Sequence, residues 1–395
     1  MGALSHLKVL DLSRVLAGPW ATQLLADLGA EVIKIERPGS GDDTRAWGPP
    51  FLTDAAGTVT PESAYFLCTN RGKRSVCLDI KSAEGQAAVR QLASQCDVVV
   101  ENFKVGDAAR YGLDYDSLRA DNPGLVYASI TGFGQTGPER ERPGYDFLVQ
   151  AMGGLMSVTG QPDGADGAGP QKVGVALTDI MTGLYTTVGI LAALAERDRS
   201  GLGQHVDLAL LDVTAATLAN QATNYLVGGL NPGRLGNAHP NIVPYQSFVA
   251  KDGHLIVAVG NDAQYQRFVT VLGVPELGQD VRFATNGDRV KHRDSLIPLL
   301  QAKMLEKPKA QWLALLEAAG VPAGPINSVA EVFDQAQIKA RGMRVNVPHP
   351  LNAELELVGN PIKLSRTPVE YGRPPPVLGE HTDEVLDSLV READL

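Results

Sequence analysis

The sequence predicts an α/β protein built on a parallel β-sheet. It starts with a β-α-β unit: an apolar strand at 7–12, a helix at 20–28 between a proline and a glycine, and a second strand at 31–36. A helix that connects two strands of one sheet makes those strands parallel. A further strand at 97–102 contains three consecutive valines. Such an apolar strand is typical of the centre of a parallel sheet, where helices cover both faces.

The other predicted elements continue this alternation of strands and helices as far as residue 226. The first βα turn lacks the G-x-G-x-x-G pattern, so the sequence does not support a dinucleotide-binding fingerprint. The segment 38–61 is rich in Gly, Pro and Asp, and we expect an ordered surface loop there. The remaining strands are predicted at 75–80, 125–131 and 205–210, and the helices at 82–95, 146–158, 177–195 and 212–226.

A smaller second module is predicted after a Gly-, Pro- and Asn-rich break at 228–240. It contains a strand at 255–259 and an amphipathic helix at 309–319, and it ends at a return linker, 322–325. Beyond this linker, the sequence Ser-Val-Ala-Glu at 328–331 forms a capping box for another helix. The chain is predicted to end in a polar amphipathic helix from about Thr382.

Composition excludes several classes of protein. A chain of 395 residues is too long for one core and suggests two or three domains. The net charge of −10 argues against a nucleic-acid partner. Cys68, Cys77 and Cys96 lack C-x-x-C spacing, which indicates a reducing compartment without disulfides or a metal site. No leader and no apolar run of roughly 18 residues is evident, so we expect a cytoplasmic protein without a membrane partner.

One carboxylate occupies an unusual place in the chain. Asp179 is the only acid between Asp166 and Glu196, in a run of small and apolar residues that is predicted to form a buried helix. An unpaired buried charge costs several kcal/mol. Asp179 therefore either caps the helix, where backbone N–H groups and the helix dipole offset that cost, or is held there as a nucleophile. The two roles are compatible.

Several short motifs, in this order, resemble the class III coenzyme A-transferases, the group of formyl-CoA transferase and carnitine-CoA transferase (CaiB–BaiF type). The resemblance spans nearly the whole chain, and the order and spacing of the motifs carry it. The matching segments are Val9-Leu10-Asp11 with Ala17-Gly18-Pro19, Val32-Ile33-Lys34-Ile35-Glu36-Arg37-Pro38-Gly39, Lys73-Arg74-Ser75, Leu78-Asp79, Val100-Glu101-Asn102-Phe103, the Asp179 helix, and 378–386.

The resemblance implies an architecture. A large, doubly wound, Rossmann-like domain would comprise 1–227 and 326–395, and a small α+β middle domain with its linkers would comprise 228–325. Two chains would thread through each other as interlocked rings, which makes the protein a homodimer. Coenzyme A and acyl-CoA would be substrates, and no cofactor or metal would be bound permanently.

The resemblance also implies a reaction, with Asp179 as the nucleophile. The carboxylate would attack a donor acyl-CoA and form a mixed anhydride, which the released CoA would convert into an aspartyl-CoA thioester. An acceptor acid would then take the CoA by the reverse steps. Holding CoA beside Asp179 makes each step intramolecular, with effective concentrations of ~10⁵ M or more. Preorganised donors would stabilise the oxyanions.

The binding residues of the family fall on defined positions of this chain. Val15, Leu16 and Ala17 match a loop that contacts CoA. Arg37 and Arg110 match phosphate-binding arginines, suited to that role by their planar guanidinium, although both could instead be solvated surface charges. The other nucleotide-side contacts are Leu78, Lys81, Asn102, Phe103 and Lys104.

The thioester and the acceptor acid are expected to meet further residues. Tyr145 and Asp146 match the segment that faces the thioester, although Asp146 could simply cap the following helix. Trp47 and Arg45 are expected near the far end of the acceptor. The acceptor pocket and its oxyanion donors are assigned to His239, Gly260 and Asn261, although a lone histidine such as His239 is more often structural.

Departures from the family pattern bear on the substrate. Leu16 stands where oxalate-type enzymes have glutamine, and only Gly260 remains where they have four consecutive glycines. We therefore expect a larger acceptor, such as a C4–C6 dicarboxylate or a hydroxy acid, with succinyl-CoA as a plausible donor. An α-methylacyl-CoA racemase would carry His-Asp in place of Tyr145-Asp146, and a phenol with a pKa near 10 is a poor base. A non-catalytic CoA-binding protein is the other alternative.

Overall fold

The computed structural model of the chain describes residues 2–393 and forms two compact units. The first comprises Met1–Leu155, Lys172–Gly228 and Ala336–Leu395, and the second comprises Met156–Gln171 and Gly229–Gln335. The segments 156–171 and 326–335, which the sequence assigned to the large domain, thus group with the second unit.

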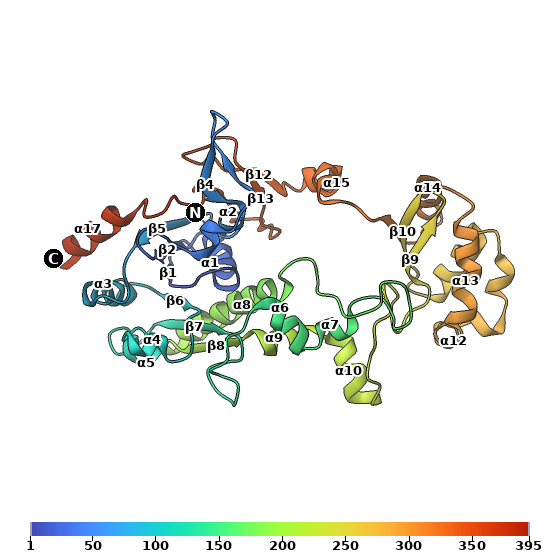
Figure 1. The fold of residues 1–395 in the computed structure, drawn as a ribbon, viewed down its shortest axis with the longest axis horizontal. Coiled ribbons are helices and arrows are strands. Elements are labelled where there is room, and N and C mark those ends of the chain that lie inside the picture. Colours follow the sequence, from blue (N-terminus) through green and yellow to red (C-terminus); the bar gives the residue numbers. More distant parts are fainter. Residues whose placement is uncertain (1, 394–395) are drawn as a thin grey trace. The chain divides into compact units, whose positions relative to one another are not determined.

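The first unit is built on a six-stranded sheet in which all strand pairs are parallel. The prediction of an α/β fold with a parallel sheet is confirmed. The chain fills the sheet outward from β1 in one direction and then from β6 in the other, so the order reverses between β1 and β6 (Figure 1). Across the sheet the strands are β5 (Lys73–Cys77), β2 (Glu31–Glu36), β1 (Lys8–Asp11), β6 (Val98–Glu101), β7 (Val126–Thr131) and β8 (His205–Ala209).

Helices cover both faces of this sheet. Alternate residues of a strand point to opposite faces, and the central strands are apolar on both, with Val98 and Val100 on one face and Val99 on the other. The first face packs against α1 (Ala17–Asp27) and α8 (Leu177–Ser200). The second packs against α3 (Ala83–Ser94), α5 (Tyr115–Leu118) and α17 (Thr382–Ala393).

The helix α8 is long and apolar enough, by length and composition alone, to cross a membrane. This finding corrects the expectation that no run of the chain reaches that length. Within the structure, Ile190 and Leu194 pack into the core beside the sheet. On another face of α8, Leu184, Tyr185 and Val188 are exposed. The prediction of a buried helix is therefore right for one face only.

Several predicted elements differ in extent from those observed. Glycines at 153 and 154 divide the helix predicted at 146–158 into α6 (Asp146–Met152) and α7 (Leu155–Val158). A second division separates α9 (Leu210–Thr217) from α10 (Ala219–Gly228), where Ala219 has a positive φ. The other short helices of the first unit are α2 (Ala64–Leu67), α4 (Asp107–Arg110) and α16 (Ala336–Ala340).

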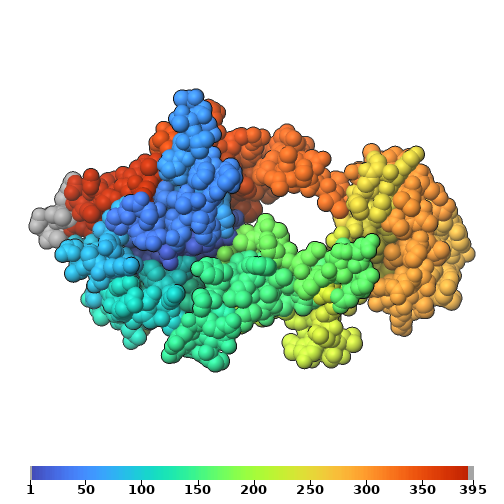
Figure 2. All heavy atoms as spheres, viewed as in Figure 1, coloured from blue at the N-terminus to red at the C-terminus, as the bar shows by residue number. Residues whose placement is uncertain are grey.

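The segment predicted as a loop at 38–61 carries secondary structure. It contains the 3₁₀ helix η1 (Asp43–Ala46) and the antiparallel hairpin of β3 (Phe51–Thr53) and β4 (Val59–Ser63). The blue hairpin projects from the first unit beside the orange segment that includes β12 (Arg344–Asn346) and β13 (Glu356–Val358) (Figure 2). There, the Asn352 amide donates a hydrogen bond of 2.7 Å to the Thr53 carbonyl.

The second unit has its own antiparallel sheet, in the order β11 (Ala323–Pro325), β10 (Gly253–Ala258) and β9 (Tyr245–Ala250). The predicted return linker thus supplies an edge strand. Ser328 and Glu331 form the expected capping box at the start of α15. The helices are α11 (Asp262–Val271), η2 (Pro275–Gly278), η3 (Val281–Phe283), α12 (Asn286–Lys291), α13 (Arg293–Met304), α14 (Lys309–Ala318) and α15 (Val329–Asp334).

Candidate active site

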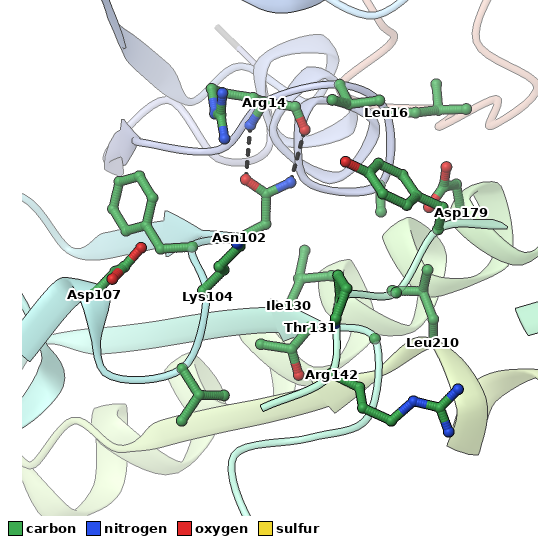
Figure 3. A pocket seen from close by; sticks show the side chains of 18 of the residues that line it. Arg14, Leu16, Asn102, Lys104, Asp107, Ile130, Thr131, Arg142, Asp179 and Leu210 are labelled. Carbon is green, nitrogen blue, oxygen red and sulfur yellow. Dashed lines mark hydrogen bonds between the residues drawn. The ribbon is translucent and has the colours of Figure 1, made fainter. Parts of the chain in front are cut away.

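A cavity of about 620 Å³ lies at the carboxyl edge of the large sheet, where the strand order reverses. In doubly wound sheets, ligands bind at this switch point because the loops diverge there. The loop after β1 and the loop after β6 form two sides of the cavity, and Asp179 lies at another (Figure 3). The predicted site residues that line this cavity are Val15, Leu16, Ala17, Trp47, Asn102, Phe103, Lys104, Tyr145 and Asp179.

Asp179 lies in the first turn of α8 without capping it. The N-cap position belongs to Ala176. The N–H groups of Thr178 and Asp179 donate instead to Oδ1 of Asp146, at 2.8 and 3.2 Å. The second oxygen of Asp146 accepts a hydrogen bond of 2.7 Å from Gln150, which is fully buried. Asp146 therefore caps α8 across space, and it does not cap the helix that follows it in the sequence.

This arrangement leaves the Asp179 carboxylate without a hydrogen-bond donor among the described residues. The side chain is half-buried and lines the cavity. Burial and, secondarily, the negative charge of Asp146 raise the pKa of Asp179 to about 7. A carboxylate in this state is poorly solvated yet reachable, which are the properties of a nucleophile rather than of a structural ion.

Asn102 fixes the loop after β1 rather than presenting a free amide to a ligand. Its Oδ1 accepts the Arg14 N–H at 2.9 Å, and its Nδ2 donates to the Arg14 carbonyl at 2.7 Å. Both bonds are visible as dashed lines in Figure 3. Asn102, which was predicted to contact CoA, thus joins the loop after β1 to the loop after β6 at the switch point.

A second cavity, of about 480 Å³, adjoins the first along the same sheet edge. The two share Arg14, Phe103 and Asp107 as lining residues. The loops after β2 and β5 complete the second cavity, and three residues that the sequence assigned to nucleotide contacts, Arg37, Leu78 and Lys81, line it. The two cavities are therefore continuous along the sheet edge, and Asp179 lines the first of them.

The arginines at the sheet edge share one carboxylate. Asp43 pairs with Arg14 at 2.6 Å and with Arg37 at 2.5 Å. Sequence reasoning missed Arg14 and Asp43, although both lie inside segments that carry predicted contacts. Arg110 is exposed, pairs with Asp107 at 3.2 Å and is absent from the lining of both cavities.

The rim near Asp179 is aromatic. The Trp47 ring, 44% exposed, packs edge-on against Tyr65 with centroids 5.2 Å apart. Burial and then the charge of Asp179 raise the pKa of Tyr65 to about 12, which identifies Tyr65 as a neighbour of the carboxylate that sequence reasoning missed. Tyr145 is 69% exposed at the start of α6. The cavity lining missed from the sequence also includes Thr131, Gly132, Arg140 and Arg142.

Arg45 does not reach the cavity. The expectation that it contacts an acceptor acid is wrong, because its buried guanidinium is fully engaged elsewhere. It pairs with Glu36 at 2.8 Å and Glu62 at 2.9 Å and lies 3.6 Å from the centroid of the Phe66 ring.

The remaining acceptor-side candidates lie in the second unit and have local contacts there. The His239 ring packs on Tyr245, and its Nδ1 accepts the Asn241 N–H at 3.0 Å. Asn261 caps α11, with its side chain accepting the Gln264 N–H at 2.9 Å. The Gly260 N–H donates to the Gln264 side chain at 2.6 Å.

The first cavity is lined by charged and aromatic side chains around Asp179. Among the residues that the structure describes, no group of three or more His, Cys, Asp and Glu side chains is placed to hold a metal ion. Of the four carboxylates that line the cavity, Asp43, Asp107 and Glu141 pair with arginines, whereas Asp179 has no such partner among the described residues. Basic and aromatic side chains form the rest of the charged and apolar wall. This combination suits an anionic substrate with a carbonyl group that a carboxylate can attack.

Comparison with known proteins shows the family of this chain. The chain is 52% identical over 386 residues to the succinate–glutarate CoA-transferase of Agrobacterium fabrum, covering 98% of this chain and 95% of the relative. It is 44% identical to the succinyl-CoA:glutarate CoA-transferase of Mus musculus, and the match covers 99% of this chain and 87% of the relative. A CaiB/BaiF family protein from Brucella suis superposes with a TM-score of 0.85 at 50% identity, covering 98% and 99%. Residues 4–382 match CoA-transferase family III, and the chain belongs to this family of enzymes.

Proposed function

We propose that the enzyme transfers coenzyme A from succinyl-CoA to a C4–C6 dicarboxylic acid, with Asp179 as the covalent carrier. The observation that carries this proposal is a cavity-lining carboxylate that accepts no hydrogen bond among the described residues. The names of the two relatives support the substrates, since both act on succinyl or succinate and on glutarate.

The reaction proceeds by four exchanges of one nucleophile for another. Asp179 attacks the thioester carbonyl, the C–S bond breaks, and CoA leaves as a thiolate from a mixed aspartyl–succinyl anhydride. The thiolate attacks the aspartyl carbonyl and displaces succinate, which leaves an aspartyl-CoA thioester. The acceptor carboxylate displaces CoA from this thioester, and CoA then attacks the acceptor acyl group. The product thioester forms, Asp179 regains its carboxylate, and no net proton is taken up or released.

The surrounding residues serve this sequence of steps by orientation and charge. Asp146 holds the first turn of α8 and therefore the position of Asp179. The positive end of the helix dipole favours the ionised carboxylate and offsets part of the desolvation cost. The second cavity, with Arg37 and Lys81, would hold the nucleotide end of CoA, so that each attack is intramolecular.

Chemical trapping tests the role of Asp179. Hydroxylamine added during turnover with succinyl-CoA should convert Asp179 into a hydroxamate, found by mass spectrometry in the tryptic peptide 173–197. Asp179→Ala should lower turnover at least about 10³-fold, because the covalent route is lost, while CoA binding stays within a few fold. Asp116→Asn, at an exposed aspartate on α5, serves as the control. Normal turnover by Asp179→Ala would refute the assignment.

We also propose that two chains form the interlocked homodimer of this family. Exposed apolar side chains on three helices of the first unit support an assembly surface: Phe147 on α6, Val188 on α8 and Val227 on α10. Patches of this kind mark protein interfaces. Light scattering should give twice the chain mass, and tagged and untagged dimers should exchange subunits only after denaturation. A monomer in solution, or rapid exchange, would contradict the interlocked assembly.

A further inference from the structure

The loop that forms one wall of the first cavity contains a backbone conformation that L-amino acids avoid. Val15 has φ +72°, and only one other non-glycine residue among those described, Ala219, has a positive φ. A β-branched residue in this region is a steric outlier, and the surrounding structure must hold it there. Val15 lines the cavity that contains Asp179.

Hydrogen-bond partners hold the peptide groups that precede Val15 in the chain. The Ser13 N–H and hydroxyl donate to Asp11 at 3.0 and 2.5 Å, and the Ser13 carbonyl accepts from the Lys34 ammonium at 2.8 Å. Arg14 is fixed by Asn102 through both of its peptide groups. The loop is therefore shaped by its partners before any ligand binds.

Val15 itself is held by one carboxylate. Its N–H donates to Asp42, with the two oxygens 3.2 and 3.3 Å from the nitrogen. Behind this contact, the ammonium of Lys34 lies 2.9 Å from Asp42, and both side chains are fully buried. Although burial opposes ionisation, Lys34 and the Thr44 N–H lower the pKa of the Asp42 carboxyl. A charged, immobile acceptor therefore faces the Val15 N–H at neutral pH.

A change in the conformation of this loop would be transmitted to Asp179 through the contact between α1 and α8. A Cβ placed on Gly183 would lie 2.7 Å from the Ala17 carbonyl, so α1 and α8 touch backbone to backbone at the end of the loop. Gly183 lies one turn of α8 beyond Asp179. A change at Val15 would move the wall of the cavity relative to the nucleophile, and a misplacement of about 1 Å can lower a rate about 100-fold.

We propose that Asp42 is a positioning residue of this enzyme: it accepts the Val15 N–H, holds Val15 in the left-handed conformation, and thereby sets the distance between the CoA-binding loop and Asp179. The inference rests on the proposed function for the identity of the ligand. It adds a residue that lies outside the first cavity, although it lines the second, and that acts on the first through the backbone of the loop.

The experiment separates the effect of the hydrogen bond to Val15 from the effect of the buried charges on Lys34 and Asp42. Lys34→Met removes the ammonium, and in that background Asp42→Asn keeps an acceptor oxygen whereas Asp42→Leu, of similar shape, removes it. A neutral replacement of a buried ion pair is often tolerated. Each of the two double variants is made with Val15 or with Val15→Gly, because glycine adopts a positive φ without a side-chain clash.

The expected pattern is a rescue specific to glycine. Lys34→Met/Asp42→Leu should lose about 10- to 100-fold in kcat/KM for succinyl-CoA, mostly through KM, and Lys34→Met/Asp42→Asn should lose less than about fivefold. Val15→Gly should restore the Leu variant to within about threefold of the Asn variant. Val15→Ala, which keeps a Cβ, should not restore it. Equal losses in the Leu and Asn variants, or equal rescue by alanine and glycine, would overturn the proposal.

Two further measurements keep the result interpretable. Calorimetric binding of free CoA should follow the same order of variants, and this readout does not depend on covalent catalysis. If hydroxylamine trapping fails in the wild type while CoA binding still shows the glycine-specific rescue, the proposed function is wrong and the positioning role stands. If the Leu variant does not fold, Lys34→Met/Asp42→Ala, which also lacks an acceptor oxygen, replaces it, with the same rescue expected and the same outcomes against the proposal.

Discussion

At the scale of single residues, the sequence singled out Asp179 but did not predict the contacts around it. Asp179 stands out because it is the only acid in a long apolar run. The role of Asp146 was not predictable, because its carboxylate caps a helix that starts more than thirty residues later in the chain. Contacts of this range depend on how two helices pack, and no local pattern encodes them.

The ionisation of Asp179 should appear in the pH dependence of transfer. Its pKa is raised to about 7, and only the carboxylate attacks, so kcat/KM for the acyl-CoA should rise with pH and level off above about 8. Asp146→Asn removes the neighbouring negative charge, keeps an oxygen for the helix N–H groups, and should move the midpoint to lower pH by about half a unit to one unit.

Initial rates between pH 5.5 and 9 measure this shift, with Asp116→Asn as the control for a loss of charge elsewhere. The midpoint of the control should stay at that of the wild type. If Asp146→Asn left the midpoint unchanged, or moved it upward, the charge of Asp146 would not be a cause of the raised pKa of Asp179.

At the scale of elements, hydrophobic patterning identified strands and helices better than it identified their ends. Strand β6 and helix α3 were predictable because an apolar run and a serine cap mark them. The break between α9 and α10 was not, because it rests on a positive φ at Ala219, a residue that favours helix. The hairpin β3–β4 was read as a loop, since its strands are short and rich in polar residues.

The contact between α1 and α8 gives a prediction for Gly183. Glycine in a helix is usually replaced by alanine with a gain of about 0.5–1 kcal/mol. Here the added methyl group would meet the Ala17 carbonyl at 2.7 Å and the Trp20 ring at 3.0 Å. Gly183→Ala should therefore lower the free energy of unfolding by about 1–3 kcal/mol and reduce kcat, because overpacking separates the helices that carry the site.

Urea denaturation and steady-state kinetics check this outcome. Gly287→Ala is a matched control in α12, where an added Cβ would meet nothing closer than 3.9 Å. The control should be neutral or slightly more stable than the wild type. A Gly183→Ala enzyme with wild-type stability and kcat would show that the two helices are not tightly packed there.

At the scale of the whole molecule, buried ion pairs join segments that are far apart in the sequence. Arg45 pairs with Glu36 and Glu62 and also donates to the Pro376 carbonyl at 3.0 Å. Arg71 pairs with Asp27 and donates to the Val358 carbonyl at 2.8 Å. The sequence did not predict these pairs, because charged side chains are normally assigned to the surface.

Replacing Arg45 should destabilise the first unit strongly. Arg45→Met would leave the buried carboxylates of Glu36 and Glu62 without their cation, and loss of one partner of a buried pair costs about 3–5 kcal/mol. Arg119→Met, which breaks an exposed pair with Asp116, should cost less than about 1 kcal/mol. Thermal unfolding of the two variants at pH 7.5 compares them, and equal melting temperatures would contradict a structural role for Arg45.

The division of the first unit between distant parts of the chain has a consequence for its synthesis. Val385 and Leu389 of α17 complete the apolar cluster over one face of the large sheet. On the ribosome, every strand of that sheet is made long before these two side chains exist. Until then, α3 and α5 cover this face of the nascent sheet only in part. We therefore expect a chaperone that binds exposed apolar surface to act while the middle of the protein is translated.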